Sequence, residues 1–270
     1  MFRIWDRTPK QQAPGQDLSE QVVKPADMSR TAREALRSYT PARIGLETAG
    51  VSVATRPLLD FQLAHARARD AVHMAIDARM LCDELRRQGL KAFALESGAG
   101  DRATFLRRPD LGRQLSPQSA EQLTPGDYDL VFVIADGLSA LAVEKHALRL
   151  LQTLLPLLPE ARLAPVCVVE QGRVAIGDAI GAALAARIAV VMIGERPGLT
   201  SPDSLGVYIT WDPKPGRRDA ERNCLSNIRE EGLSYAVAAS RLSYYIQEAS
   251  RRETTGVALK DPNENLAGLL

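Results

Sequence analysis

The chain has 270 residues, with 34 Lys and Arg against 33 Asp and Glu, which leaves a formal net charge of +1. That balance disfavours a protein that holds nucleic acid through bulk electrostatics. A hydrophobic content of 45% excludes an intrinsically disordered chain, and three cysteines are too few for a disulfide scaffold. The length suits one large domain or two small ones with a substantial core.

The first 41 residues differ in composition from the remainder, because a stretch with Gln, Pro and Gly (Gln11–Gln16) separates short segments of helical character. We predict an N-terminal extension over 1–41 that either docks on another surface or frays. Its start has no uninterrupted apolar run, so a secretory signal is not expected. No stretch of the chain approaches the ~18 apolar residues of a membrane-spanning helix, so no membrane partner is expected.

The cysteines, Cys82, Cys167 and Cys224, are widely spaced and form no metal-binding motif. Free thiols in a cytoplasmic protein are therefore expected. The histidines of the chain are His65, His73 and His146. They form no metal-ligating pattern with the cysteines, so each histidine is expected at the surface or in the core.

Helix and strand patterns alternate along the chain. Ser29–Arg37 is expected to form a short helix, and the apolar periodicity from Thr55 to Arg87, closed by Gly89, predicts one long helix. Strands are predicted at Leu90–Glu96, Tyr128–Ala135, Leu163–Val169, Ile188–Ile193 and Gly206–Trp211, and further helices at Asp101–Leu106, Ser139–Leu155, Ile180–Arg187 and Ser234–Arg251.

Strands that alternate with helices at this spacing indicate βαβ units, which form a parallel sheet with helices on its faces. We therefore predict an α/β fold, a Rossmann-like, doubly wound, mostly parallel sheet over 42–261 that is followed by a tail over 262–270. In such sheets a ligand lies beyond the carboxyl ends of the strands. This rule selects four loops: Ser97–Asp101, Asp136–Ser139, Glu170–Asp178 and Gly194–Leu199.

The segment Ser97–Ala103 begins like a dinucleotide-binding loop, with Gly98 and Gly100 between a strand and a helix. No acidic residue follows a second strand at the expected distance, so an ordinary glycine turn is favoured. The chain also lacks a GxxxxGK[ST] phosphate loop, a GxSxG motif and a nucleophile with an adjacent base. A self-contained hydrolase or kinase is disfavoured, while a nucleotide-dependent enzyme remains an alternative.

Three polar segments are candidates for a binding edge: Gly172–Asp178, Gly194–Ser204 and Arg222–Ile228. The first two follow predicted strands, and the third lies in a long polar connection. Plain loops are the alternative, in which Glu195 and Arg196 form a local ion pair.

These segments also carry a family resemblance. From about Arg43 to Asp261 the sequence resembles the small (light) subunit of ethanolamine ammonia-lyase. The matching segments are Arg43–Leu46, Pro57–Val72, Arg108–Arg113, Ala135–Ala140, Gly172–Val174, Gly194–Leu199, Arg222–Asn227 and Gly256–Asp261. Their number and order make the resemblance specific.

The resemblance implies an adenosylcobalamin-dependent complex that deaminates ethanolamine to acetaldehyde and ammonia by a radical mechanism. A large subunit would hold ethanolamine and carry the radical chemistry, so this chain would be inactive alone. The small subunit would be Rossmann-like and would help to bind cobalamin at the interface. Carried over by motif, the cobalamin-contacting residues are Val174, Glu195 and Cys224. A purely structural partner of the large subunit remains an alternative.

The chain has no D-x-H-x-x-G motif, through which other cobalamin domains supply a histidine to cobalt. We therefore expect that no side chain of this chain ligates the metal. Glu195 would accept hydrogen bonds from corrin amides, and Cys224 would pack or hydrogen-bond rather than react. The resemblance implies a cytoplasmic complex, and residues 1–41 are where a signal for a bacterial microcompartment would lie.

Overall fold

The computed structural model describes residues 30–40 and 42–261. The chain divides into two compact units, one that ends at Leu59 and one that begins at Asp60. Most of the predicted extension over 1–41 and the predicted tail over 262–270 lie outside the described residues. Within those residues, no helix is both long enough and apolar enough to cross a membrane.

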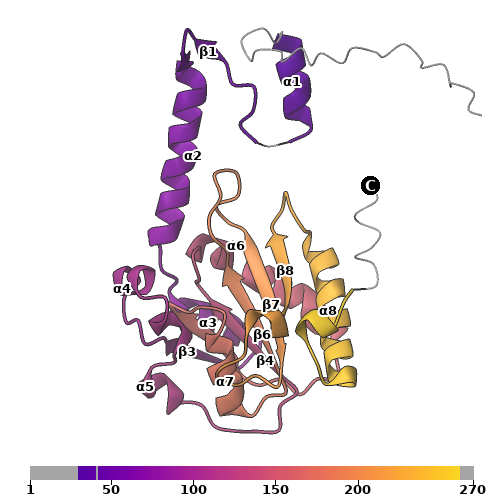
Figure 1. The fold of residues 1–270 in the computed structure, drawn as a ribbon. Coiled ribbons are helices and arrows are strands. Elements are labelled where there is room, and N and C mark those ends of the chain that lie inside the picture. The colour runs from indigo at the N-terminus through magenta and orange to yellow at the C-terminus, as the bar shows by residue number, and fades with distance from the viewer. Residues whose placement is uncertain (1–29, 41, 262–270) are drawn as a thin grey trace, which may run out of the picture. The chain divides into compact units, whose positions relative to one another are not determined.

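The first unit contains one helix and a small hairpin. Helix α1 (Arg30–Ser38) precedes β1 (Thr48–Ala49) and β2 (Ser52–Val53), which pair antiparallel (Figure 1). The helix expected at Ser29–Arg37 is confirmed over its described residues. Arg37 links α1 to the following loop by donating a hydrogen bond to the Gly45 carbonyl (2.9 Å).

Two helices occupy the region where one was expected. Helix α2 (Thr55–His73) contains the boundary between the units, and α3 (Ala78–Arg87) follows in the second unit. The prediction of a single helix from Thr55 to Arg87 is therefore wrong. The chain leaves helical geometry after His73 and re-enters it after Asp77 (φ −91°, ψ 95°), whose side chain accepts a hydrogen bond from the Met80 amide (2.9 Å). Asp77 is thus an N-cap that starts a new helix.

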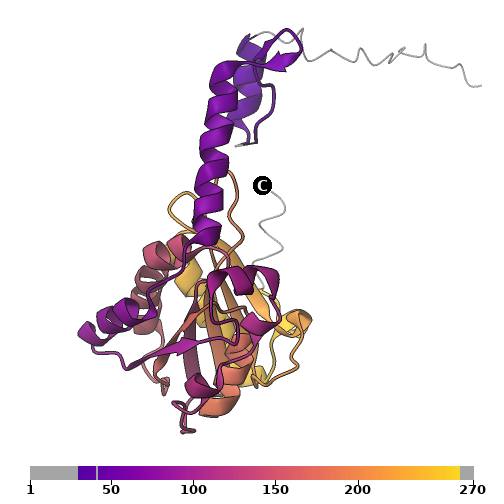
Figure 2. The ribbon, with the colours of Figure 1, turned by 90° about the vertical axis from the view of Figure 1, so that its left-hand side faces the viewer.

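The second unit is built on one six-stranded sheet in the order β3-β5-β4-β6-β7-β8 (Figures 1 and 2). The first four strands run parallel, β7 is antiparallel to β6, and β8 is antiparallel to β7. The fold is therefore mixed α/β, and all five predicted strands are confirmed. The strands are β3 (Ala92–Glu96), β4 (Leu130–Ala135), β5 (Val166–Glu170), β6 (Ile188–Gly194), β7 (Leu205–Trp211) and β8 (Asn223–Ile228).

The long polar connection expected at Arg222–Ile228 is instead the edge strand β8, so that prediction is wrong. Leu225 and Ile228 are buried, whereas Cys224 and Ser226 are exposed. Because only one side of this strand meets the core, it lacks the unbroken apolar run by which doubly covered strands are recognised.

Helices cover both faces of the sheet. Alternate residues of β4 point to opposite layers: Phe132 packs with α3, α6 and α8, and Val133 packs with α7. All of β4 is buried as a result. The helices of this unit, besides α3, are α4 (Arg102–Arg107), α5 (Pro117–Ala120), α6 (Ala140–Leu154), α7 (Ile176–Leu184) and α8 (Tyr235–Arg252), with short 3-10 turns at Leu111–Arg113, Leu155–Leu157, Asp219–Glu221 and Gly256–Ala258.

One helix boundary is displaced from its predicted place. Helix α7 starts at Ile176 rather than Ile180 and stops at Leu184, because Ala185 adopts the left-handed conformation (φ 54°) and cannot continue the helix. The earlier start brings the first turn of α7 close to the end of β5.

The connections that leave β4 and β6 run in opposite directions. The chain leaves β4 through α6 toward β5, whereas it leaves β6 directly toward β7. The loops that follow β4 and β6 consequently separate and leave an opening at the carboxyl ends of these strands. This opening is the first place to look for a site.

Candidate functional site

A cavity of about 410 Å³ lies at this opening, and we call it the edge cavity. Its walls come from the loops after β4, β5 and β6 and from β7 and β8. The lining includes Leu138, Arg173, Val174, Glu195, Tyr208 and Ser226. Three of the four loops selected by the sheet rule contribute residues, namely Asp136–Ser139, Glu170–Asp178 and Gly194–Leu199.

The fourth loop, Ser97–Asp101, does not line this cavity. The Gly98 amide donates to the Gln114 carbonyl (2.8 Å), and the Asp101 side chain caps α4 at the Thr104 amide (2.9 Å). These polar groups therefore bond the neighbouring segment at Gln114 and the start of α4. These contacts favour the ordinary glycine turn over a dinucleotide-binding loop.

Glycine lets the loops after β4 and β6 meet backbone to backbone. The Leu138 amide donates to the Gly194 carbonyl (2.9 Å), and Gly137 has φ +54°. A Cβ at Gly194 would clash with the Ser139 carbonyl, and a Cβ at Gly137 would clash with that of Gly194. This part of the cavity wall therefore requires both glycines.

Asp136 joins the loop after β4 to the loop after β5. Its carboxylate is fully buried and accepts hydrogen bonds from the amides of Gln171 (3.1 Å) and Gly172 (3.0 Å). Arg102 approaches it at 3.2 Å. Burial raises the pKa of Asp136 to about 6, against the opposing effects of the Arg102 charge and the backbone amides. The sequence placed Asp136 in a loop directly after a buried strand and in the family segment Ala135–Ala140, but it gave no sign of these contacts.

Glu195 joins three segments of the site. Its carboxylate accepts hydrogen bonds from the hydroxyls of Ser226 (2.5 Å) and Ser204 (2.5 Å) and from the Asn227 amide (3.2 Å). Gly206 leaves room for it, since a Cβ there would lie 2.9 Å from the Glu195 Oε1 atom. Within the described residues Glu195 forms no ion pair with Arg196, in contrast to the plain-loop alternative.

Two non-glycine residues beside these carboxylates have left-handed backbones. Gln171 has φ 58° and Asn227 has φ 60°. Gln171 donates its amide to Asp136, and Asn227 donates its amide to Glu195. Unfavourable conformations of this kind cluster at functional sites, where the surrounding contacts hold them.

Cys224 lies beside the edge cavity rather than in its lining. It stands opposite Tyr208 in the register of β7 and β8, and the two side chains share a hydrogen bond. Although the residue is exposed on β8, the groups packed around its sulfur exclude water and raise the pKa of the Cys224 thiol; the Tyr208 hydroxyl lowers this pKa and the Glu195 charge raises it. The thiol is therefore protonated near neutral pH and a weak nucleophile.

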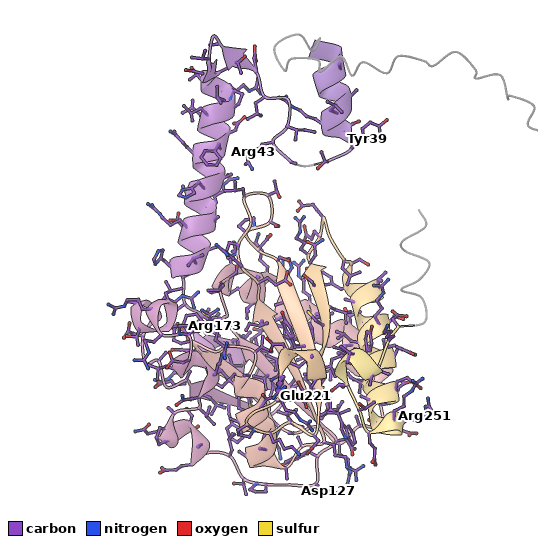
Figure 3. The ribbon with its side chains drawn as sticks, in the orientation of Figure 1. Tyr39, Arg43, Asp127, Arg173, Glu221 and Arg251 are labelled. Atoms are coloured by element: carbon purple, nitrogen blue, oxygen red, sulfur yellow. The ribbon has the colours of Figure 1, made fainter. Side chains whose placement is uncertain are left out.

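Of the three predicted site residues, Val174 and Glu195 thus line one cavity, and Cys224 adjoins it. Val174 is half-buried and packs against the core layer of α7. Its neighbour Arg173 (Figure 3) also lines the cavity, and the sequence offered no sign of it beyond its place in the Gly172–Val174 segment.

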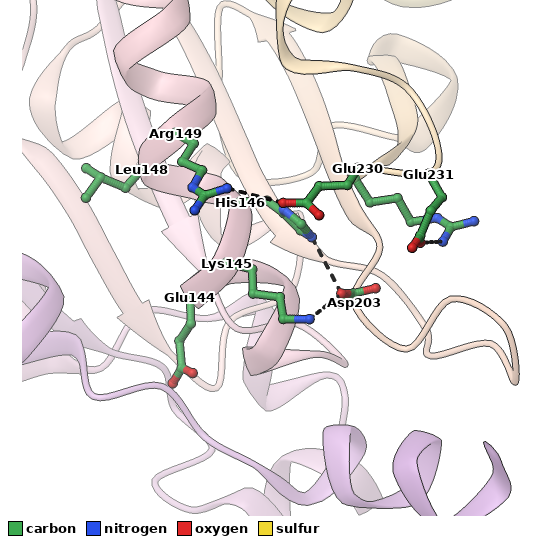
Figure 4. A pocket seen from close by; sticks show the side chains of 9 residues that line it. Glu144, Lys145, His146, Leu148, Arg149, Asp203, Glu230 and Glu231 are labelled. Atoms are coloured by element: carbon green, nitrogen blue, oxygen red, sulfur yellow. Dashed lines mark hydrogen bonds and ion pairs between the residues drawn. The ribbon is translucent and has the colours of Figure 1, made fainter. Parts of the chain in front are cut away.

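A second cavity of about 460 Å³, which we call the charged cavity, lies beside α6 (Figure 4). Its charges pair with one another: Lys145 with Asp203 (2.7 Å) and Arg149 with Glu230 (3.3 Å). His146 is buried there as a core residue, and burial lowers its pKa, so the ring is neutral. A third cavity, of about 640 Å³, lies at the other end of the sheet, near the start of β4.

Over residues 30–40 and 42–261, no group of three or more His, Cys, Asp and Glu side chains could hold a metal ion. The expectation that cobalt receives no ligand from this chain stays a prediction.

The family model described as ethanolamine ammonia-lyase light chain (EutC) matches residues 30–260. The chain is 56% identical over 237 residues to the ethanolamine ammonia-lyase small subunit of Azotobacter vinelandii, which covers 85% of this chain and 88% of the relative. It is 53% identical over 237 residues to the same subunit of Pseudomonas aeruginosa (85% and 87% covered). It is 53% identical over 245 residues to that of Xanthomonas campestris pv. campestris (88% and 90% covered).

The family model covers nearly all of the segment from Arg43 to Asp261 that carries the resemblance. It includes every strand and helix of the second unit. Identity above half over most of both chains leaves no other family to consider. The chain belongs to the ethanolamine ammonia-lyase light-chain family.

Proposed function

We propose that this chain combines with a large subunit into an adenosylcobalamin-dependent ethanolamine ammonia-lyase, and that it supplies one wall of the cobalamin site. The single observation that carries this proposal is the edge cavity, where Val174 and Glu195 meet at the carboxyl ends of the strands. Helices on both faces and the reversal between β4 and β6 further support a Rossmann-like, doubly wound sheet, in which ligands bind at this place.

The residues of the cavity suit a corrin, a broad ring with an apolar face and a rim of amides. Leu138 and Val174 offer apolar contact, and Glu195 and Ser226 offer polar atoms. A carboxylate has about four acceptor positions, so the three donors on Glu195 leave room for one corrin amide N–H. The buried Nε of Arg173 has no acceptor among the described residues and is free to serve a ligand.

When bound, adenosylcobalamin would supply the radical chemistry that converts ethanolamine to acetaldehyde and ammonia. This chain's part is to bind and orient: Glu195 accepts from the corrin rim, Val174 packs on it, and the protonated Cys224 packs beside it without reacting. Ethanolamine and the catalytic groups belong to the large subunit, so the chain alone is inactive. No side chain of this chain would bind cobalt, because the chain has no histidine in a D-x-H-x-x-G motif.

Co-expression with the large subunit tests the proposal. Ethanolamine deamination is expected only when both chains and adenosylcobalamin are present, with a visible spectrum in which cobalt retains the corrin's own base. Deamination by this chain alone, or a protein imidazole on cobalt, would contradict it.

The Glu195→Ala variant tests whether this chain forms part of the cobalamin site or only supports the large subunit. The variant should raise the cobalamin concentration needed for half-maximal activity in the assembled complex. An unchanged requirement would favour the structural role. A stand-alone nucleotide-dependent enzyme is less favoured, because the Gly98 amide of the Ser97–Asp101 loop is already bonded to the Gln114 carbonyl and Asp101 caps α4.

We also propose that residues 1–41 form an extension that docks the complex or addresses it to a bacterial microcompartment in the cytoplasm. Fusion of residues 1–41 to a fluorescent protein tests this, since recruitment to the compartment is expected from the fusion and not from the fluorescent protein alone.

A further inference from the structure

The Arg173 side chain is held at the wall of the edge cavity by contact with an aromatic ring. Its guanidinium carbon lies 4.4 Å from the centroid of the Phe105 ring, and Phe105 is fully buried. The Nε atom of Arg173 is buried and has no hydrogen-bond partner in the described part of the chain. A buried donor without an acceptor destabilises the folded chain, so an arrangement that keeps one needs a reason.

The turn at Arg108–Arg113 is built to support this side chain. The Arg173 amide donates to the Gly112 carbonyl (2.8 Å). A Cβ at Gly112 would lie 2.8 Å from the Phe105 ring and 3.0 Å from the Arg173 Cγ atom, so only glycine fits. Asp110 bonds Arg108 (2.7 Å) across the turn. The family segment at Arg108–Arg113, to which the proposed function gives no role, is thereby explained as the support of Arg173.

More positive than negative charges surround Arg173. Arg102 lies against the same Phe105 ring, at 4.8 Å, and its own charge is matched by Asp136. Burial and the charges of Arg102 and Arg113 lower the pKa of Arg173, whereas only Asp136 opposes them. The Arg102 Nη2 atom is also buried without an acceptor among the described residues. Both observations indicate that a negative charge is missing from this wall.

We infer that Arg173 binds a phosphate group with one negative charge and that, given the proposed function, this group is the phosphodiester in the nucleotide loop of cobalamin. A guanidinium presents a planar set of donors that matches two phosphate oxygens, and stacking on Phe105 fixes that plane before the ligand arrives. The corrin amides carry no charge and could not balance the cluster.

The test compares two corrins on the complex with the large subunit. Cobinamide keeps the corrin ring and its amides but lacks the phosphodiester, the ribose and the base. Equilibrium dialysis of cyanocobalamin and dicyanocobinamide, read by visible absorbance, measures both affinities. Arg173→Gln should weaken cyanocobalamin binding about tenfold or more, as expected for loss of a charged hydrogen bond, and should leave dicyanocobinamide binding within about twofold.

Arg113→Gln is the matched control, because it removes the same charge from an exposed residue of the same turn. It should weaken cyanocobalamin binding by no more than about twofold. Arg173→Lys, which keeps the charge but loses the planar donors, should fall between the wild type and Arg173→Gln. The melting temperature of each complex shows whether the variants remain folded.

Equal loss for both corrins, or no loss for either, would overturn the inference. Labelling of Arg173 by phenylglyoxal, followed by mass spectrometry, gives a second readout. Cyanocobalamin should protect Arg173 and dicyanocobinamide should not. If inorganic phosphate alone protects, the site serves free phosphate and the assignment to the cofactor is wrong. If the wild-type complex binds neither corrin, the proposed function fails, and phosphate protection then decides the anion site by itself.

Discussion

The edge cavity and the charged cavity are similar in volume, about 410 and 460 Å³, but differ in how their charges are paired. In the charged cavity, Lys145 and Arg149 each bond a carboxylate of the same cavity. In the edge cavity, Arg173 has no acceptor for its buried Nε among the described residues. The buried Nε2 atom of His146 in the charged cavity also lacks a hydrogen-bond partner among the described residues, but that ring is neutral, so the two cavities differ in unpaired charge rather than in size.

The largest expected effect comes from Asp136→Ala, which removes the negative charge that pairs with Arg102 and leaves two buried backbone amides without their acceptor. Breaking a buried pair in this way should lower the free energy of unfolding by about 3–5 kcal/mol. The counterpart in the charged cavity is Asp203→Ala, whose partner Lys145 is half-exposed. That variant should cost at most about 1 kcal/mol. Urea titration measures the free energy of unfolding of both variants, and equal losses would contradict the expected difference between the two cavities.

The stability of the chain should depend on pH through Asp136, which lies beside the edge cavity. Because the pKa of Asp136 rises from 3.8 to about 6 on folding, the folded chain binds a proton that the unfolded chain releases between these values. Its contribution to stability is therefore complete below pH 3.8 and is lost as the pH rises through 6, by at most about 3 kcal/mol. Urea titrations at several pH values should show that the free energy of unfolding of Asp136→Asn no longer falls as the pH rises through 6. If the variant shows the same fall as the wild type, other groups cause it.

Gly194→Ala tests whether the backbone contact shapes the edge cavity. The added methyl would meet the carbonyls of Ser139 and Asp136, so a loss of about 1–3 kcal/mol in the free energy of unfolding is expected, with weaker cobalamin binding. Gly98→Ala is the control, because its Cβ would meet its nearest neighbour at an ordinary 3.4 Å. Similar losses in both variants would show that the close approach has no special role.

The smallest effect concerns thiol reactivity. Burial raises the pKa of Cys82 to about 11 and that of Cys167 to about 12, whereas Cys224 is exposed. A disulfide reagent should therefore modify Cys224 first, slowly at neutral pH, and cobalamin in the complex should protect it. Mass spectrometry after timed quenching measures the order. Early modification of Cys82 or Cys167 would contradict the structure.

The sequence predicted those parts of the fold that depend on local apolar pattern. Within Tyr128–Ala135, the residues after Asp129 are an unbroken apolar run, as is Ile188–Ile193, and both runs are strands buried on two faces. Because the ends of parallel strands meet at one edge, these runs also located the loops of the edge cavity. The strand β8 escaped prediction, since Leu225 and Ile228 alone are buried among its exposed polar residues.

The contacts that define the site depend on residues far apart in sequence, and local pattern cannot reveal them. Phe105 stacks under Arg173, and Asp136 accepts amides of the loop after β5, only because the sheet order places their strands side by side. The break after α2 was missed for a different reason. Asp77 is a good helix start, but the apolar residues around it continue the helical period.

The three hydrogen bonds that hold Glu195 have a consequence for the free energy of ligand binding. A carboxylate side chain that is free in solution loses about 0.5–1.5 kcal/mol of rotational freedom when a ligand immobilises it. Ser204, Ser226 and Asn227 already immobilise Glu195 when the subunit folds. That entropy is therefore lost once, during folding, and a corrin that reaches the edge cavity meets an acceptor that is already in position.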